Sequence, residues 1–506
     1  MSLRFILLIA CAGIALDSAG QEPEGWPLLS PLSPALEEAN QYRAEAHSSL
    51  QPLAPFLEEA TLQRTVDSLF WRRTDNHLQV KPLLDVRAGG IAQPSLDYAQ
   101  WAGAGVSLRG RFGNRWTLRL NTSVYSAFLP NYLSPDSGRK DILPGIGGAT
   151  RVGESYVAPY LSGALSCRLG NHFSLEAGRG KHFWGDGYRS MALSHNAAPF
   201  PYVSLTTKVW NIKYVNLWTM LRDISPQPST NGNLKFATMH ALSWNVSKRL
   251  NLSLYEAVVW QAKDSLNNRS FEMNYLNPVI LLRPVEFAQG SADNSLLGLG
   301  ARFKVRKDVQ LYGQVFFDEF LLYEMNRNEG WWANKFGLQF GVKTWNFLLP
   351  GLNVLTEMNM AKPFTYTHGS VLQAYGHQDQ SLAHPLGTNF LEWITKLEYH
   401  TPNWRLENTF MWAIQGSDLN GENYGSDVFR SYRNPKSAYG NYVAQGLKST
   451  IHYEECTYLR RLNEGSPLWW TLSGGFRYIS NDLEQHLDPF VFIGIRSEIR
   501  GPYLDK

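Results

Sequence analysis

The sequence predicts an all-β protein, namely a transmembrane antiparallel β-barrel of about 18 strands. Beyond residue 78, apolar and polar residues alternate along most of the chain, which places them on opposite faces of strands. The polar faces carry arginines, which an apolar protein core rarely accepts. Short polar turns also alternate with long connections, as they do in membrane barrels that have a greasy outside and a wet lumen.

The stretch 101–124 shows the alternation most clearly, because it reads as one hairpin around a turn at 112–115. In its second strand, one face is Trp116, Leu118, Leu120 and Val124, and the other is Thr117, Arg119, Asn121 and Ser123. Trp116 stands next to the turn, where a membrane barrel carries an aromatic girdle. Taken alone, this hairpin also fits a two-sided sheet in a soluble β-sandwich.

Length and composition agree with one large barrel. The chain has 506 residues, of which 44% are hydrophobic, 13% aromatic and 18% charged, with a formal net charge of +3. A single soluble domain rarely exceeds about 300 residues, so the alternative is a chain of several domains. The near-neutral charge and the absence of a Lys/Arg block give no reason to expect a nucleic-acid partner.

The first 20 residues resemble an export signal. Arg4 precedes an apolar run from Phe5 to Leu16, and small residues at 18–20 offer a cleavage site. The alternative is a lipoprotein cleavage box ending at Cys11, which would leave a very short apolar segment. Beyond residue 20 we find no run of about 18 apolar residues. If the protein is in a membrane, it is therefore there as a barrel.

Residues 21–77 are expected to form a periplasmic linker and a short helical segment. Residues 21–34 are rich in proline, and apolar residues then recur at helical spacing over 34–50 and 55–73, with Pro52 and Pro55 between the two. Because this pair precedes the first strand, we expect it on the periplasmic side, under or just inside the barrel mouth. Packing on the barrel end is preferred over an active gate.

The barrel is expected to span residues 78–500. Short turns lie at 113–114, 170–171, 210–211, 247–249, 306–308, 346–351, 401–403 and 458–467. Their flanking strands, together with Leu78–Ile91 and Phe490–Ile499 at the two ends, give the count of about 18. This number is even and returns both termini to one side. A short tail, 501–506, follows, so the chain does not stop on the usual terminal aromatic residue.

The two cysteines that follow the signal, Cys167 and Cys456, are far apart in the sequence. They form neither a disulfide framework nor a metal-site motif. Cys167 stands on the apolar phase of its strand, and we interpret both residues as structural.

The predicted outer loop 180–190 has the densest set of chemically capable residues. Trp184, Asp186, Tyr188 and Arg189 combine aromatic rings with charged groups. Sugars stack their apolar faces on aromatic rings, and their hydroxyls bond to charged groups. An equally good interpretation is that Trp184, Tyr188 and Arg189 brace a loop that folds into the barrel mouth.

A series of phrases in the same order along the chain resembles the capsule assembly Wzi family, in particular the branch often labelled as gliding motility proteins. They are Phe183–Ser190, Asn274–Pro278 with Arg283–Glu286, Leu311–Gln314 with Asp318–Phe320, Trp331–Lys335, Tyr366–His368 and His384–Phe390. The resemblance covers most of residues 80–500. It implies an outer-membrane barrel of the same strand number, with periplasmic helices and with loops that hold capsular or other surface polysaccharide.

We therefore expect a non-enzymatic, exported outer-membrane protein that binds or anchors surface polysaccharide and supports capsule assembly, with no cofactor. One alternative is a pore for small polar solutes, which needs an open lumen. Another is a component of a surface adhesion or gliding motility apparatus, whose partners are proteins. The expected glycan contacts are stacking on Trp184, Trp331 and Trp332, hydrogen bonds from Asp186, Arg189, Lys335 and Asn389, and contact with Tyr188.

Catalytic and metal sites are weaker interpretations. Asp318 and Glu319 are adjacent, so on a strand only one of them would reach the lumen. A second carboxylate would have to come from Glu286, Glu392 or Glu398, within the roughly 5–10 Å that glycosidases use. We expect ion pairs that stabilise the wall instead. One loop also holds several possible metal ligands, but their spacing fits no tight motif: His368, His377, Asp379 and His384.

Overall fold

The computed structural model describes residues 49–51, 71–73, 76–92, 96–129, 133, 141–223, 234–262, 271–280, 293–319, 321–327, 329–463, 468–497 and 505. The predicted signal peptide and the linker up to residue 48 lie outside these ranges. Within them, no helix is long and apolar enough to cross a membrane.

The described chain forms a closed antiparallel barrel of 18 long strands. They are β3 (Asn76–Ala92), β4 (Leu96–Phe112), β5 (Trp116–Phe128), β9 (Ser155–Arg168), β10 (Phe173–Gly180), β12 (Phe200–Val209), β13 (Ile212–Arg222), β14 (Leu234–Asn245), β15 (Leu250–Gln261), β16 (Asn294–Lys304), β17 (Val309–Glu319), β18 (Lys335–Thr344), β19 (Leu352–Ala361), β22 (Phe390–His400), β23 (Trp404–Ser417), β24 (Leu447–Arg461), β25 (Leu468–Ser480) and β26 (Gln485–Ser497).

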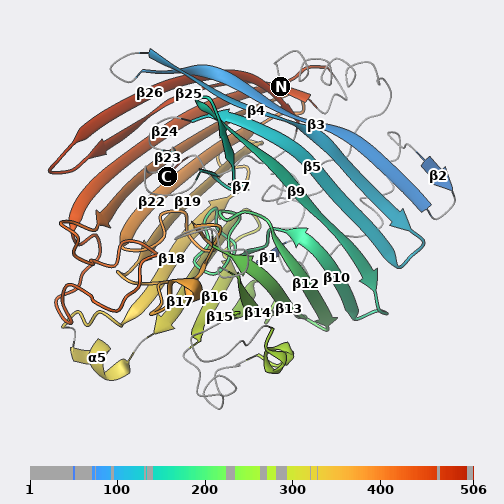
Figure 1. Ribbon diagram of the computed structural model, residues 1–506. Helices are drawn as coiled ribbons and strands as arrows, with labels where there is room; N and C mark the ends of the chain where they lie inside the picture. The colour runs from blue at the N-terminus through green and yellow to red at the C-terminus, as the bar shows by residue number, and fades with distance from the viewer. Residues whose placement is uncertain are drawn as a thin grey trace.

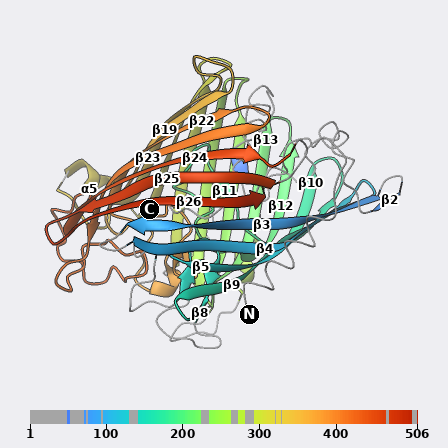
Figure 2. The same ribbon diagram turned by 90° about the horizontal axis from the view of Figure 1, so that it is seen from above.

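Each long strand pairs with the next one along the chain, and β26 closes the ring by pairing with β3. Closure satisfies the backbone groups of every wall strand, which a lipid environment requires. Figure 1 and Figure 2 show the strands tilted and wrapped around a common interior. The predicted barrel and its strand number are therefore confirmed.

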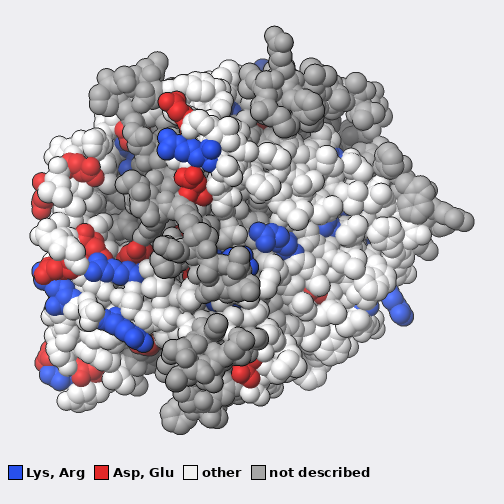
Figure 3. All heavy atoms as spheres, in the orientation of Figure 1, with Lys and Arg blue, Asp and Glu red and all other residues white. Residues whose placement is uncertain are grey.

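Short turns and long loops lie at opposite ends of the barrel, as predicted. Seven of the predicted turns are described in full and join neighbouring strands, while the eighth, 458–467, is described only in part and begins within β24. As an example, the turn after β4 contains Gly113. Its φ of 57° is a left-handed conformation that glycine adopts without steric cost. We call the end that carries the long loops the outer end. Charged side chains gather on the left part of Figure 3, where Figure 1 places α5 (Leu322–Arg327) and neighbouring outer loops.

The two faces of the wall differ as the alternation predicts. In β5, Trp116, Leu120 and Val124 face outward and are 44%, 38% and 57% exposed. Arg119 and Asn121 face the lumen and are 8% and 3% exposed. The apolar outside of the wall suits contact with lipid, while the buried polar groups find partners inside.

The N-terminal helical prediction is not supported where the structure describes the chain. Most of residues 34–73 lies outside the described ranges, but Leu50–Gln51 forms strand β1 and Trp71–Arg73 forms strand β2. β2 extends β3 at the short-turn end. β1 lies inside the barrel and pairs with β11 (Phe183–Trp184), a strand of an outer loop. At Leu50–Gln51 the backbone is a strand because its partner, β11, lies far away in the sequence.

Two loops enter the interior of the barrel and pack against its wall. The largest apolar core joins wall residues to residues of loops 181–199 and 362–389, among them Trp184, Met191, Tyr366, Tyr375 and Leu382. Within these loops, β20 (Gly376–His377) pairs with β21 (Gln380–Ser381), and η3 (Val371–Gln373) precedes them. The hydrophobic core of this protein therefore lies in its lumen.

One outer connection instead covers the outside of the wall. The 3-10 helix η2 (Met273–Leu276) lies against β13, β14 and β15, where the carbonyl oxygen of Tyr275 accepts from Trp218 Nε1 at 3.1 Å and from Thr238 Oγ1 at 2.9 Å. His240 and Glu256 also face outward here, 3.1 Å apart, and both are buried. The connection that contains η2 lies on this same outer side of the wall.

Short elements complete the outer connections. β6 (Ile142–Leu143) pairs with β7 (Gly147–Gly148), and β8 (Thr150–Val152) extends β9. They pack with Trp101, Tyr125 and Tyr160 in a separate apolar cluster under the outer end of β4, β5 and β9.

Candidate functional site

The loop 181–199 between β10 and β12 enters the lumen and carries four of the residues predicted to bind glycan. Trp184, at 2% exposed, stacks on Tyr255 with ring centroids 6.2 Å apart. Its backbone oxygen accepts from Gln314 Nε2 at 2.9 Å. Asp186 forms an ion pair with Arg302 at 3.3 Å. The structure thus supports the interpretation that this loop is braced inside the mouth.

Arg189 is the centre of this arrangement. Its guanidinium is fully buried and lies 3.1 Å from Glu392 Oε1 on β22 and 3.2 Å from Asp505 Oδ1 in the C-terminal tail. It also donates to the Asp505 backbone oxygen at 2.7 Å. The hydroxyl of Tyr188 donates to the other Asp505 carboxylate oxygen at 2.9 Å. The outer loop, the wall and the C-terminal tail therefore meet at one cation.

Glu357 on β19 fixes the backbone of the same loop. Its two carboxylate oxygens accept from the N–H groups of Tyr188 and Arg189, each at 2.9 Å, and from the Tyr312 hydroxyl at 2.7 Å. A side chain at Gly187 would place its Cβ 2.5 Å from this carboxylate. Only glycine therefore lets the chain pass so close to Glu357.

His384, from the second lumen loop, completes the set. Its Nε2 lies 2.8 Å from Glu392 Oε2, and the Asn359 amide donates to both Glu357 and Glu392 at 3.0 and 2.9 Å. Burial lowers the pKa of His384, although the neighbouring Glu392 opposes that shift. We call these six residues the lumen network: Arg189, Glu357, Asn359, His384, Glu392 and Asp505.

Lys335 and Asn389, also predicted to bind glycan, are buried as well. Lys335 Nζ lies 3.1 Å from Asp318 Oδ1 and donates to the Thr367 backbone oxygen at 3.1 Å. Asn389 Nδ2 donates to the Gln445 backbone oxygen at 2.9 Å. Lys335 on β18 thus joins the wall to a loop, and Asn389 joins two outer connections. Because Trp184, Arg189, Lys335 and Asn389 are at most 2% exposed, the structure leaves them no surface on which to hold an external sugar.

Where the structure describes them, the residues considered for catalysis or metal binding do not all come together in one site; each contacts a different partner. Asp318 reaches the lumen, as predicted, and is engaged by Lys335. His377 Nδ1 accepts from the Arg222 backbone N–H at 3.0 Å, whereas His384 contacts Glu392. Among the described residues, no three His, Cys, Asp or Glu side chains are placed to hold a metal ion.

The outer surface carries the accessible aromatic residues. Loops 320–334 and 418–446 join there, because Gly440 N donates to the Glu329 oxygen at 2.8 Å and Trp332 N donates to the Ala438 oxygen at 3.0 Å. Trp331 and Trp332, both predicted contacts, are partly exposed. Three tyrosines flank them with 70%, 41% and 64% of their surface exposed: Tyr323, Tyr439 and Tyr442.

A single arginine sits between two of these rings. The Arg327 guanidinium lies 5.8 Å from the Tyr323 ring and 5.7 Å from the Tyr439 ring. This places flat apolar faces beside a hydrogen-bond donor, the combination that sequence reasoning had sought in loop 180–190. We call it the outer platform: Tyr323, Arg327, Trp331, Tyr439 and Tyr442.

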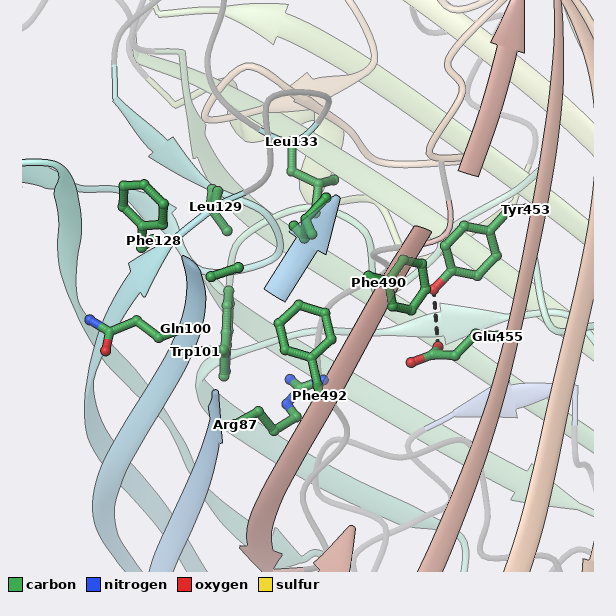
Figure 4. A pocket seen from close by; sticks show the side chains of 12 residues that line it. Arg87, Gln100, Trp101, Phe128, Leu129, Leu133, Tyr453, Glu455, Phe490 and Phe492 are labelled. Carbon is green, nitrogen blue, oxygen red and sulfur yellow. Dashed lines mark hydrogen bonds between the residues drawn. The ribbon is translucent and has the colours of Figure 1, made fainter. Parts of the chain in front are cut away.

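A cavity that sequence reasoning missed lies inside the wall of β3, β4, β24 and β26 (Figure 4). Its empty volume is about 520 Å³. Five of its twelve lining residues are aromatic, and Arg87 and Glu455 are charged; Glu455 accepts from the Tyr453 hydroxyl at 3.0 Å. Its lining is distributed over several strands, so no local motif marks it.

Comparison with known proteins adds the fold class. No protein-family model and no curated protein matches the chain. Among solved structures, Wzi of Escherichia coli, described as a carbohydrate-binding β-barrel of the outer membrane involved in group 1 capsule assembly, has a TM-score of 0.50 and 14% identity. The match covers 82% of this chain and 84% of Wzi. The chain has the fold of an outer-membrane β-barrel.

Two further barrels from Pseudomonas aeruginosa are similar to a lesser degree. OprD has a TM-score of 0.44 and 10% identity, over 83% of this chain and 94% of that one. OpdK, an outer-membrane protein, has a TM-score of 0.45 and 8% identity, over 83% and 98%.

Replacing Arg189 with methionine tests the lumen network. The change leaves the Glu392 and Asp505 carboxylates buried without their cation, so the free energy of unfolding should fall by about 3–5 kcal/mol. Urea unfolding in lipid vesicles measures it. The matched control is Arg306→Met, whose partner Asp308 lies in an exposed turn and whose loss should cost under about 1 kcal/mol. Equal effects of the two variants would contradict a central role for Arg189.

The lumen loops should loosen in acid. Burial lowers the pKa of His182 and of His368 to about 4 and that of His377 to about 3. An unfolded histidine titrates near ~6.5, so below that pH the unfolded state binds more protons, and stability falls as the pH drops toward 4. Proteolysis of loops 181–199 and 362–389 should be faster at about pH 4.5 than at pH 7.

His182 offers a direct check on this acid effect. Its ring packs against Phe200 and Tyr202, so His182→Phe keeps an aromatic ring and removes the titrating group. This variant should show a smaller difference between the two pH values. Cleavage that does not depend on pH in the unaltered protein would refute the idea.

Proposed function

We propose that this protein is a non-enzymatic outer-membrane barrel that binds or anchors surface polysaccharide on its outer loops and so supports capsule assembly. The observation that carries the proposal is an accessible aromatic platform on a barrel whose lumen is occupied by its own loops. The likeness to Wzi, described as a carbohydrate-binding barrel, is consistent with it but concerns the fold alone.

The loops in the lumen favour a protein that binds ligands on its outer surface over a pore that lets solutes pass. A pore needs an open channel, whereas here Arg189 from one loop, His384 from another and Asp505 meet in the lumen network, and β1 pairs with β11 inside the barrel. Breaking such buried ion pairs is costly. The loops are therefore held as a structural filling that supports the outer surface.

The outer platform has the chemistry that sugar recognition uses. The tyrosine rings are exposed to solvent, and Arg327 can donate hydrogen bonds between two of them. Exposed aromatic rings give apolar contact at low entropic cost, and guanidinium groups orient polar partners. We propose that this platform, and not loop 180–190, makes the glycan contacts.

Glycan-array binding of the detergent-purified protein tests the proposal. Tyr323→Ala and Arg327→Ala should each weaken binding to a recognised polysaccharide by about tenfold, or about 1.4 kcal/mol, since each removes one contact group. Trp184→Phe should leave binding unchanged, because this ring is buried. A loss with Trp184→Phe and none with the platform variants would place the site elsewhere. A deletion strain that keeps its capsule and loses only movement would favour the motility alternative.

Planar-bilayer recordings test the rival pore function. The unaltered protein should carry little ionic current, since its loops fill the lumen. Arg189→Met should carry more, because the loop loses its central ion pairs. Large sustained currents from the unaltered protein would favour the pore.

A further inference from the structure

Strand β24 differs from its neighbours on the side that faces the membrane. Its residues Ile451, Tyr453 and Leu459 are buried on the lumen side. The alternate residues of this fully described strand face outward, and none of them is aliphatic: Lys448, Thr450, His452, Glu454, Cys456, Tyr458 and Arg460. The flanking strands β23 and β25 present Leu406, Phe410 and Leu472 instead, each about 40% exposed. A polar stripe therefore runs down one wall of the barrel.

The centre of the stripe lies at membrane depth. β24 spans 15 residues, and a strand needs about 9–11 to cross the hydrocarbon region. Glu454 stands in the middle of β24. Asn408, which also faces outward on β23, donates to its carboxylate at 3.5 Å. Ionisable groups at this depth are costly in lipid and normally meet a partner.

Elsewhere in the barrel, outward-facing polar side chains are paired and buried. His240 and Glu256 also face outward, but they pair with each other and are buried on the side that η2 covers. On β24, by contrast, Cys456 is exposed and Glu454 is partly exposed. The stripe therefore lacks the full cover that His240 and Glu256 have.

We propose that the stripe on β24 is the contact surface for a second copy of this chain within the membrane. The stripe and the adjoining Asn408 on β23 supply both donors and acceptors, such as Lys448 and Glu454, so a donor on one copy can meet an acceptor on the other. Small residues also lie at the centre of this face. Gly474 stands opposite Cys456 on β25, and a Cβ added there would have its nearest contact only at 3.6 Å. Small residues at this point let two walls approach closely.

Symmetry fixes which residues should meet. All copies insert with the same orientation, and twofold contacts are the commonest in oligomers. A twofold axis along the membrane normal keeps each residue at the same depth in both copies, and two tilted strands approach closely only where they cross. If they cross at Cys456, which lies opposite Gly474, the two thiols meet there. Figure 2 shows β22 to β26 side by side on one wall, so this surface is continuous.

Oxidative cross-linking in intact outer membranes tests the proposal. The experiment uses the Cys167→Ser variant, in which Cys456 is the one thiol left beyond the predicted signal. Copper phenanthroline should then produce a disulfide-linked species of twice the monomer mass, which reductant removes. Glu454→Leu should reduce its yield several-fold, because the contact loses its central acceptor.

Two controls keep the outcome clear. Val124→Cys in a background without Cys167 and Cys456 places a thiol on another lipid-facing position, 57% exposed, and should give no dimer. The heat-dependent gel mobility of each variant shows whether its barrel is folded. Cross-linking at Cys456 no greater than at position 124, or a Cys456 adduct only with a different protein, would overturn self-association.

Discussion

The buried charge of Arg189 is the constraint on which the interior depends. A guanidinium without exposure to water must be paired, and its partners here are Glu392 on the wall and Asp505 in the C-terminal tail. Glu357 then holds the adjacent backbone through two hydrogen bonds. Because such groups are costly when left alone, the loop, the wall and the tail are stable only together. This requirement holds the loop inside the barrel.

The wall follows a different rule, which lipid imposes. Every backbone group must be paired, and the closed ring from β3 to β26 achieves this. Outward side chains must be apolar, covered or in contact with a partner. The outward residues of β5 are apolar, and the His240–Glu256 pair is covered. The stripe on β24 is neither apolar nor covered, and for this reason we expect a partner to contact it.

These rules divide the protein into a fixed interior and an accessible outer end. Aromatic residues that look equally suited to sugar binding in the sequence lie in two different places, either buried in the lumen or exposed at the outer end. Trp184 is an interior packing residue, whereas Tyr323 and Tyr442 are open to solvent. In the function proposed above, a polysaccharide approaching from outside meets the second group, on loops that are joined by backbone hydrogen bonds. The filled lumen gives those loops a rigid base.

The sequence by itself determined the strands, their turns and their faces, since each depends on a period of two and on local turn chemistry. The separation of Arg119 from Leu120 and the turn at Gly113 could be read locally for this reason. Which loops fold inward was decided only by tertiary structure. The partners of Arg189 lie 203 and 316 residues away along the chain, so no local pattern contains them. A loop rich in aromatic and charged residues has the same composition whether it binds a sugar or fills a barrel, and only its partners distinguish the two.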